Sequence, residues 1–114
     1  MTTRSAVTTH VLDSTRGRPA TGVPVRLEQL VGGVAEVVAK SVTDADGRAI
    51  DLGPDAAPTG TYRLVFDTGT YFSVTGQTGF YPEVTVTFII ADPARHCHVP
   101  VLLSPYAYST YRGS

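Results

Sequence analysis

The sequence predicts an all-β fold, a two-sheet β-sandwich of seven to eight strands with one short helix. Short segments of alternating apolar and polar residues follow one another, and Gly, Pro or Asp-Gly turns separate them. The segments vary in length, and their expected edges carry proline and charge, which favours a sandwich over a closed barrel. With 114 residues, 42% of them hydrophobic and 17% charged, the chain is expected to form one globular domain over 1–114.

The first half of the chain is expected to supply four strands. They are predicted at 5–13, 23–31, 34–43 and 48–52. In the second of them, Val23, Val25 and Leu27 share one face, and Arg26 and Glu28 lie on the other. The pair Gly32-Gly33 predicts a tight hairpin, and the pair Asp46-Gly47 predicts the turn before Arg48.

The second half is expected to supply four more strands and a helix. The strands are predicted at 60–68, 83–90, 96–104 and 106–112, and the helix at 70–75. Alternation in the second strand predicts four inward residues, Val84, Val86, Phe88 and Ile90.

The last two strands carry unusual outer faces. In 96–104 the core face is expected to hold Cys97, Val99, Val101 and Leu103, and the opposite face His96, His98, Pro100 and Leu102. In the last strand Tyr106, Tyr108, Thr110 and Arg112 share one side. Semi-apolar outer faces of this kind indicate burial against another subunit.

Composition excludes several classes of partner. The formal net charge of -1 gives no electrostatic reason to expect nucleic acid or an anionic membrane. No apolar run approaches the ~20 residues that span a bilayer. The single cysteine excludes an internal disulfide framework, and residues 1–13 lack the features of a secretory signal. A cytoplasmic location is expected.

Three residues are suited to hydrolytic chemistry. His10 and His98 are candidate bases because an imidazole ordinarily titrates near neutrality, and Arg48 could polarise a carbonyl or hold an anion. Taken singly, each has a structural alternative, such as a strand histidine bonded to backbone. The His96-x-His98 spacing also occurs in strand-borne zinc sites, for which His10 is the only further histidine. No GxSxG elbow supports a covalent serine mechanism.

Three separated stretches resemble one known family. "TTHVLDSTRGRPATGVPVRL", "FYPEVTVTF" and "HCHVPVLLSPYAYSTYRGS" are similar to the 5-hydroxyisourate hydrolases, the enzymatic branch of the transthyretin-related family. The terminal "YRGS" is the most specific element, and the carrier transthyretin lacks it. Cys97 stands where the family commonly has tyrosine, but alternation places this side chain toward the core, away from the chemistry.

The resemblance implies a transthyretin-like sandwich that assembles as a homotetramer, with active sites at the dimer–dimer interface. It implies hydrolytic opening of the six-membered ring of 5-hydroxyisourate to 2-oxo-4-hydroxy-4-carboxy-5-ureidoimidazoline, without metal or cofactor. The implied catalytic residues are His10, Arg48, His98 and Ser114. The implied substrate-binding residues are His10, Arg48 and Tyr111.

The sequence leaves some roles open. One of His10 and His98 helps to deprotonate water, and the other holds or protonates the substrate. Ser114 acts through its hydroxyl or the terminal carboxylate.

Two functions are alternatives to the hydrolase: a non-catalytic small-ligand carrier of the transthyretin type and a structural sandwich module. The His10, Arg48, His98 and Ser114 set argues against the carrier, and the absence of linkers argues against the module.

Overall fold

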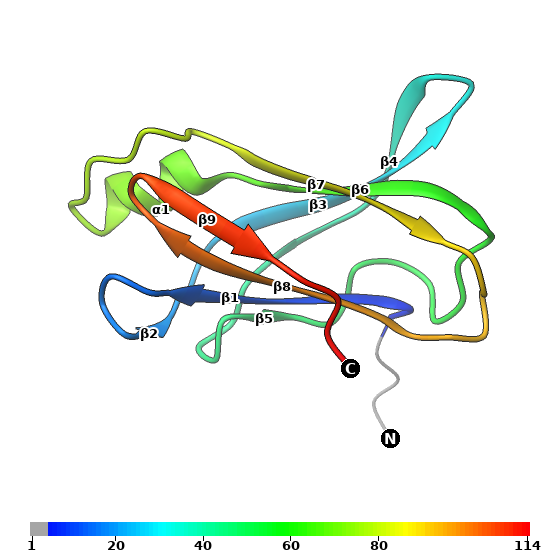
Figure 1. Cartoon of the computed structure of the whole chain (residues 1–114), viewed down its shortest axis with the longest axis horizontal. Coiled ribbons are helices and arrows are strands. Elements are labelled where there is room, and N and C mark those ends of the chain that lie inside the picture. The colour runs from blue at the N-terminus through cyan, green and yellow to red at the C-terminus, as the bar shows by residue number, and fades with distance from the viewer. Residues whose placement is uncertain (1–4) are drawn as a thin grey trace.

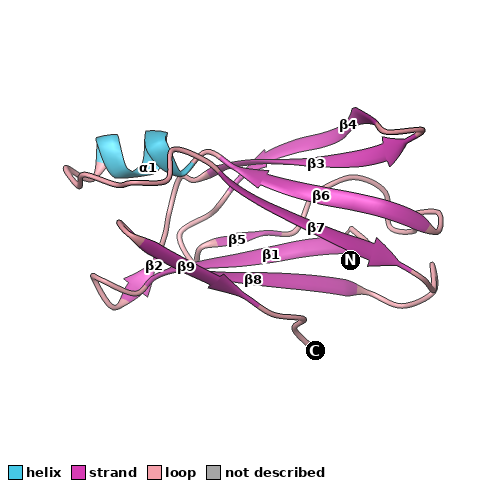
Figure 2. Cartoon of the chain, turned by 45° about the horizontal axis from the view of Figure 1, so that its top comes forward, coloured by secondary structure: helices cyan, strands magenta, loops and turns pink. Residues whose placement is uncertain are grey.

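The described strands form two sheets that pack face to face (Figures 1 and 2). The structure is a computed structural model that describes residues 5–114; residues 1–4, part of the stretch considered for a signal, lie outside the described residues. We call the layers the β1–β8 sheet and the β3–β6 sheet. Two layers with one short helix confirm the predicted all-β sandwich.

The β1–β8 sheet has the order β2-β1-β8-β9, and β5 also pairs with β1. Its strands are β1 (Val7–Asp13), β2 (Arg18–Pro19), β5 (Arg48–Ala49), β8 (Cys97–Ser104) and β9 (Ala107–Thr110). The β3–β6 sheet has the order β4-β3-β6-β7. Its strands are β3 (Pro24–Val31), β4 (Val34–Val42), β6 (Gly60–Phe66) and β7 (Val84–Ile90).

The core lies between the two sheets and follows the alternation expected from the sequence. On β8 all four predicted core residues are buried: Cys97, Val99, Val101 and Leu103. On β7 Val84 and Ile90 are buried, and Val86 and Phe88 are partly buried against the core. The four inward predictions for β7 are therefore confirmed.

The hairpin between β3 and β4 turns at the predicted glycine pair. Gly32 and Gly33 have φ angles of 58° and 79°. A two-residue turn with positive φ at both positions matches the right-handed twist of the flanking strands, and glycine adopts this conformation without a steric cost. The pair thus sets the register next to the turn, in which Val31 pairs with Val34 and Glu28 with Val37.

Helix α1 (Thr68–Val74) begins two residues before the predicted start at 70. Asp67, the residue after β6, caps the helix by accepting a hydrogen bond from the backbone N–H of Thr70. This cap marks the point at which the strand ends and the helix begins. The helix lies at one end of the sandwich (Figure 2) and buries Tyr71 and Phe72. Within the described chain, no helix has the length and apolar character needed to cross a membrane.

Three parts of the β1–β8 sheet differ from expectation. β2 was not predicted, and β5 covers only two of the residues expected at 48–52. On β9, Tyr108 pairs with Leu103 and Thr110 with Val101. Residues paired across antiparallel strands share a face, so these two residues lie on the core-facing side, and their assignment to an outer face was wrong. Tyr108 is still 42% exposed because it lies at an open edge of the sandwich.

Candidate functional site

The outer face of the β1–β8 sheet brings two predicted histidines together. β1 and β8 pair in parallel, with Thr8 beside His98 and His10 beside Pro100. Successive residues of a strand point to opposite faces, so Thr8 and His10 share the side of the sheet that faces away from the core. The two histidines therefore approach each other from neighbouring strands, although 88 positions separate them in the sequence.

Arg48 reaches the same face through a close backbone approach. β5 pairs antiparallel with β1 so that Arg48 lies opposite His10. The preceding residue, Gly47, accepts a hydrogen bond from the N–H of Val11 at 2.7 Å. A Cβ at Gly47 would lie 2.3 Å from the carbonyl oxygen of Val11, so no larger residue fits without a shift. The Asp-Gly turn thus positions Arg48 beside His10.

The C-terminal residues dock on β8. The N–H of Gly113 donates to the carbonyl oxygen of His98 at 2.8 Å. A Cβ at Gly113 would lie 2.5 Å from Cδ2 of His98, so the backbone packs directly against the imidazole edge. Glycine is required here by contact, not by backbone conformation. In Figure 1 the red C-terminal segment runs past β8 in agreement with this contact.

These segments enclose a polar pocket of about 370 Å³ at the surface. Its lining residues are Thr8, His10, Arg48, Ile50, His98, Tyr111, Gly113 and Ser114. All five residues predicted for the site, His10, Arg48, His98, Tyr111 and Ser114, are among them. The volume lies in the range of small-molecule sites. Imidazoles, a guanidinium and hydroxyls can together bind a polar ring and move protons.

Thr8 lines the pocket and is only 2% exposed, but the sequence did not predict it as a site residue. Its Oγ1 lies 2.8 Å from Nε2 of His96 and 2.9 Å from Nδ1 of His98. The period-two alternation that starts at His10 places Thr8 on the same face, and this was the available signal. That Thr8 lies beside His98 follows only from the parallel pairing of β1 with β8, which the sequence does not show.

The zinc alternative gains no third ligand from the structure. His96 and His98 meet at the hydroxyl of Thr8. Among residues 5–114, no group of three or more His, Cys, Asp or Glu residues is arranged to hold a metal ion.

A second cavity lies at the open edge between β7 and the C-terminal strands. It measures about 280 Å³ and is mostly apolar, with Val86, Phe88, Cys97 and Val99 in its wall. His98 and Tyr111 line both cavities. Only the polar pocket also contains His10, Arg48 and Ser114, so the hydrolytic groups converge there.

At its far end, β1 carries a buried carboxylate that connects this strand to helix α1 and to the segment after the helix. Asp13 is 1% exposed and accepts hydrogen bonds from the Tyr71 hydroxyl at 2.6 Å and the Gln77 amide at 3.2 Å. Burial opposes ionisation, but the bonds donated by Tyr71, the Arg16 N–H and Gln77 hold the pKa of Asp13 below its usual value. Burial and the bond to Asp13 raise the pKa of Tyr71 to about 12.

Comparison with known proteins identifies relatives of the whole chain. Residues 7–113 match the model of the HIUase/Transthyretin family. A 5-hydroxyisourate hydrolase of Mus musculus is 45% identical over 116 residues, which cover 99% of this chain and 98% of the relative.

Two solved structures share the fold. A 5-hydroxyisourate hydrolase of Klebsiella pneumoniae has a TM-score of 0.85 and 37% identity, covering 95% of this chain and 97% of the other. Sea bream transthyretin in complex with thyroxine has a TM-score of 0.90 and 32% identity, covering 95% of this chain and 94% of the other.

Proposed function

Because the chain belongs to the HIUase/Transthyretin family, and the Mus musculus relative that is 45% identical to it is a 5-hydroxyisourate hydrolase, we propose that the polar pocket is the active site of a 5-hydroxyisourate hydrolase. The chain is an enzyme that hydrolyses 5-hydroxyisourate, opening its six-membered ring to 2-oxo-4-hydroxy-4-carboxy-5-ureidoimidazoline. The observation that carries the assignment of the site is the convergence of all five predicted residues in one pocket.

The backbone alone does not separate an enzyme from a carrier. The transthyretin structure superposes with the higher TM-score of the two, 0.90 against 0.85, but the hydrolase has the higher sequence identity. Function depends on the side chains that the shared fold presents. Here two imidazoles and a guanidinium face one polar pocket, a set suited to turnover rather than to passive binding.

The chemistry assigned to these side chains is attack of water on a ring carbonyl. One imidazole accepts a proton from water as its oxygen bonds to the carbonyl carbon, and the carbonyl π electrons move to the carbonyl oxygen. The guanidinium of Arg48 stabilises this oxyanion. The oxyanion then collapses, the ring C–N bond breaks, and the second imidazole protonates the departing nitrogen. His10 and His98 fill these two roles.

The C-terminal segment orients the reactants. Tyr111 and Ser114 line the pocket on the side opposite β5, and Gly113 holds the segment on β8. Tyr111 can donate a hydrogen bond to a polar ring substituent. Ser114 can bind the attacking water through its hydroxyl or the terminal carboxylate. Hydrogen bonds to a fixed water reduce the entropic cost of attack.

Assembly as a homotetramer, with the pockets at the dimer–dimer interface, is part of the proposal. Leu12 and Leu102 are register partners that lie half-buried on the same outer face as His10 and His98. Apolar side chains beside a polar pocket are suited to contact with a second subunit. A Leu102→Glu variant should lower both the native mass and the turnover. A monomeric wild type with full turnover would contradict this arrangement. A cytoplasmic location is also part of the proposal.

The test of function is direct. 5-Hydroxyisourate generated freshly from urate decays spontaneously, and its ultraviolet absorbance can be followed with and without the protein. We expect the protein to accelerate the decay and His98→Ala to abolish that acceleration. A decay rate equal to the spontaneous rate would refute the enzymatic function.

A further inference from the structure

The hydroxyl of Thr8 joins two imidazoles on the outer face of the β1–β8 sheet. Thr8 pairs in register with His98 on the parallel strand β8, and His96 precedes His98 by two residues. Both distances from Oγ1, 2.8 Å to Nε2 of His96 and 2.9 Å to Nδ1 of His98, are hydrogen-bond lengths. Thr8 is buried, so water competes little for these bonds.

Proton counting limits the state of these rings. A hydroxyl has one proton, so Thr8 donates to one ring only, and the other ring must present an N–H to it. In one arrangement, Nδ1–H of His98 donates to Thr8, and Thr8 donates to Nε2 of His96. In the reverse arrangement, Nε2–H of His96 donates to Thr8, and Thr8 donates to Nδ1 of His98.

Only the first arrangement is compatible with proton uptake at Nε2 of His98. There the neutral His98 ring carries its proton on Nδ1, and its cation keeps that proton, so the bond to Thr8 survives the catalytic step. In the reverse arrangement the neutral ring already carries a proton on Nε2 and cannot accept another there. The hydrogen bond made by one ring nitrogen thus determines the chemistry of the other.

The ring of His98 is also fixed by packing. Its Cδ2 edge lies against the backbone of Gly113, where a Cβ would come within 2.5 Å. Contact with Gly113 on one edge and with Thr8 at Nδ1 restricts rotation of the imidazole. By contrast, no side-chain hydrogen bond to His10 is present within residues 5–114. The two pocket histidines therefore differ in how strictly they are oriented.

From these contacts we infer that Thr8 and His96 are positioning residues that hold His98 as its Nδ1–H tautomer. This inference rests on the proposed function, because it assigns the exchange of protons with the substrate to Nε2 of His98. In the step, the O–H bond of water breaks, its proton bonds to Nε2, and the oxygen attacks the ring carbonyl. Nδ1–H continues to donate to Thr8 throughout.

The tautomer can be measured without substrate. The chain has three histidines, so ¹⁵N-histidine labelling gives three imidazole spin systems that single His→Ala variants assign. We expect the neutral His98 ring of the wild type and of Thr8→Ser to be protonated at Nδ1. Thr8→Val keeps the shape of the side chain and removes the hydroxyl, and should shift His98 toward the Nε2–H form. An unchanged His98 spectrum in Thr8→Val would overturn the inference.

Kinetics supply the second readout. Thr8→Val should lower kcat by roughly 10- to 100-fold, the usual effect of losing a group that orients a catalytic residue, with KM changed by less than about threefold. Thr8→Ser should recover most of the lost kcat. His96→Leu should resemble Thr8→Val, because it removes the acceptor for the Thr8 hydroxyl.

A neighbouring threonine provides the matched control. Thr9 is also buried, but its hydroxyl donates to the carbonyl oxygen of Val99 at 2.6 Å on the core side. Thr9→Val makes the same chemical change and should leave the His98 tautomer and kcat near wild type. If the wild type fails to accelerate decay of 5-hydroxyisourate, the proposed function fails. If it does accelerate decay and Thr8→Val matches it in kcat, only the positioning role fails.

Discussion

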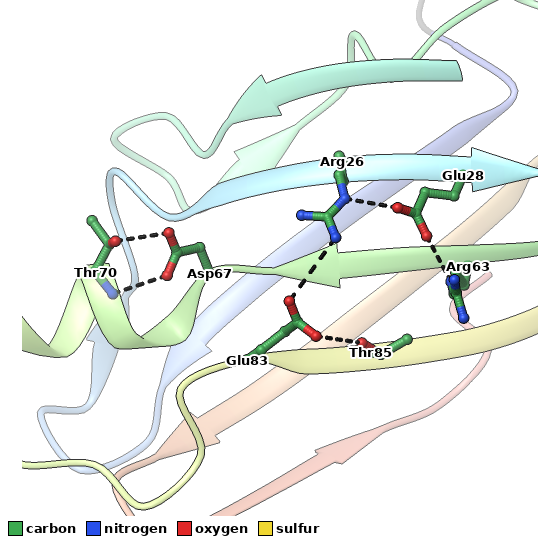
Figure 3. A network of polar contacts seen from close by, with 7 residues as sticks. All are labelled: Arg26, Glu28, Arg63, Asp67, Thr70, Glu83 and Thr85. Carbon is green, nitrogen blue, oxygen red and sulfur yellow. Dashed lines mark hydrogen bonds and ion pairs between the residues drawn. The ribbon is translucent and has the colours of Figure 1, made fainter. Parts of the chain in front are cut away.

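The outer faces of the two sheets both carry charged and polar side chains, but they use them differently. On the β3–β6 sheet, Glu28 receives a hydrogen bond at each carboxylate oxygen, from Arg26 at 2.8 Å and from Arg63 at 2.6 Å (Figure 3). On the β1–β8 sheet, His10, Arg48 and His98 surround a pocket of about 370 Å³. In the first case the charges neutralise one another, and in the second they face a space that a ligand can enter.

The difference shows what marks a functional face. Glu28 is only 6% exposed because the two arginines cover it. The bonds from Arg26 and Arg63 hold the pKa of Glu28 below its usual value, so the carboxylate stays charged and paired. A network of this kind fixes strands relative to one another. Polar groups mark a site for chemistry when they converge on a pocket, as His10, Arg48 and His98 do here.

The largest effect on turnover is expected from variants that remove a catalytic side chain from the polar pocket. His10→Ala, Arg48→Ala and His98→Ala should each reduce turnover of 5-hydroxyisourate by at least ~10²-fold, since each removes a group that transfers a proton or stabilises the oxyanion. Steady-state kinetics on folded variants measure this. Glu28→Gln, on the opposite sheet, is the control and should keep wild-type turnover. Full activity in folded His98→Ala would remove that residue from the mechanism.

A smaller loss is expected when the C-terminal contact is disturbed. Gly113→Ala places a methyl group against the His98 ring, which must move, and turnover should fall on the order of 10-fold. Deleting Gly113 and Ser114, or adding a C-terminal tag, should also lower turnover and leave the melting temperature close to wild type. Ser109→Ala, an exposed position on β9, is the control. A tagged protein with full activity would show that the terminus has no catalytic part.

Disrupting the network of Arg26, Glu28 and Arg63 should lower stability without changing turnover, the opposite of what is expected for the pocket variants. Glu28→Gln removes the negative charge and one of the two accepting oxygens, but Arg26 and Arg63 remain partly exposed and can be solvated. We therefore expect the free energy of unfolding to fall by about 1–2 kcal/mol. Urea titration measures this change. A loss of activity at unchanged stability would contradict the structural role of the network.

The smallest effect concerns acid stability. The folded-state pKa of Glu28 lies below the usual value of 4.5, so its contribution to stability is fully present above pH 4.5. That contribution is lost as the pH falls through the folded-state pKa, because the unfolded chain binds the proton more readily. Below pH 4.5 the stability of Glu28→Gln should fall less steeply than that of the wild type. Part of the slope should remain, because the pKa of Asp13 is also lowered. If the stability of Glu28→Gln and that of the wild type fell equally steeply with pH, Glu28 would not be held ionised in the folded protein.

Local patterns in the sequence predicted much of the fold. Alternation identified the core face of β8, and Gly32-Gly33 and Asp46-Gly47 located turns that require positive φ or close approach. Helix α1 begins earlier than predicted because Asp67 caps its first turn. The face of β9 was wrong because pairing with β8, a tertiary contact, sets its register.

The residues of the pocket could be predicted because a motif resemblance named them, whereas their supports could not. Thr8 acquires its role only through the parallel pairing that brings it beside His98. Glu28 lies on the expected outer face of β3, yet its burial depends on Arg63, a residue of β6 that is 35 positions away. Contacts between strands that are distant in sequence leave no local pattern.

One experiment tests the distinction between the two faces most directly. The decay of freshly generated 5-hydroxyisourate is followed by ultraviolet absorbance with wild type, His98→Ala and Glu28→Gln at equal concentration. We predict acceleration by wild type and Glu28→Gln, and a rate near the spontaneous one with His98→Ala. No acceleration by the wild type, or equal acceleration by folded His98→Ala, would contradict the assignment of the active site to the outer face of the β1–β8 sheet.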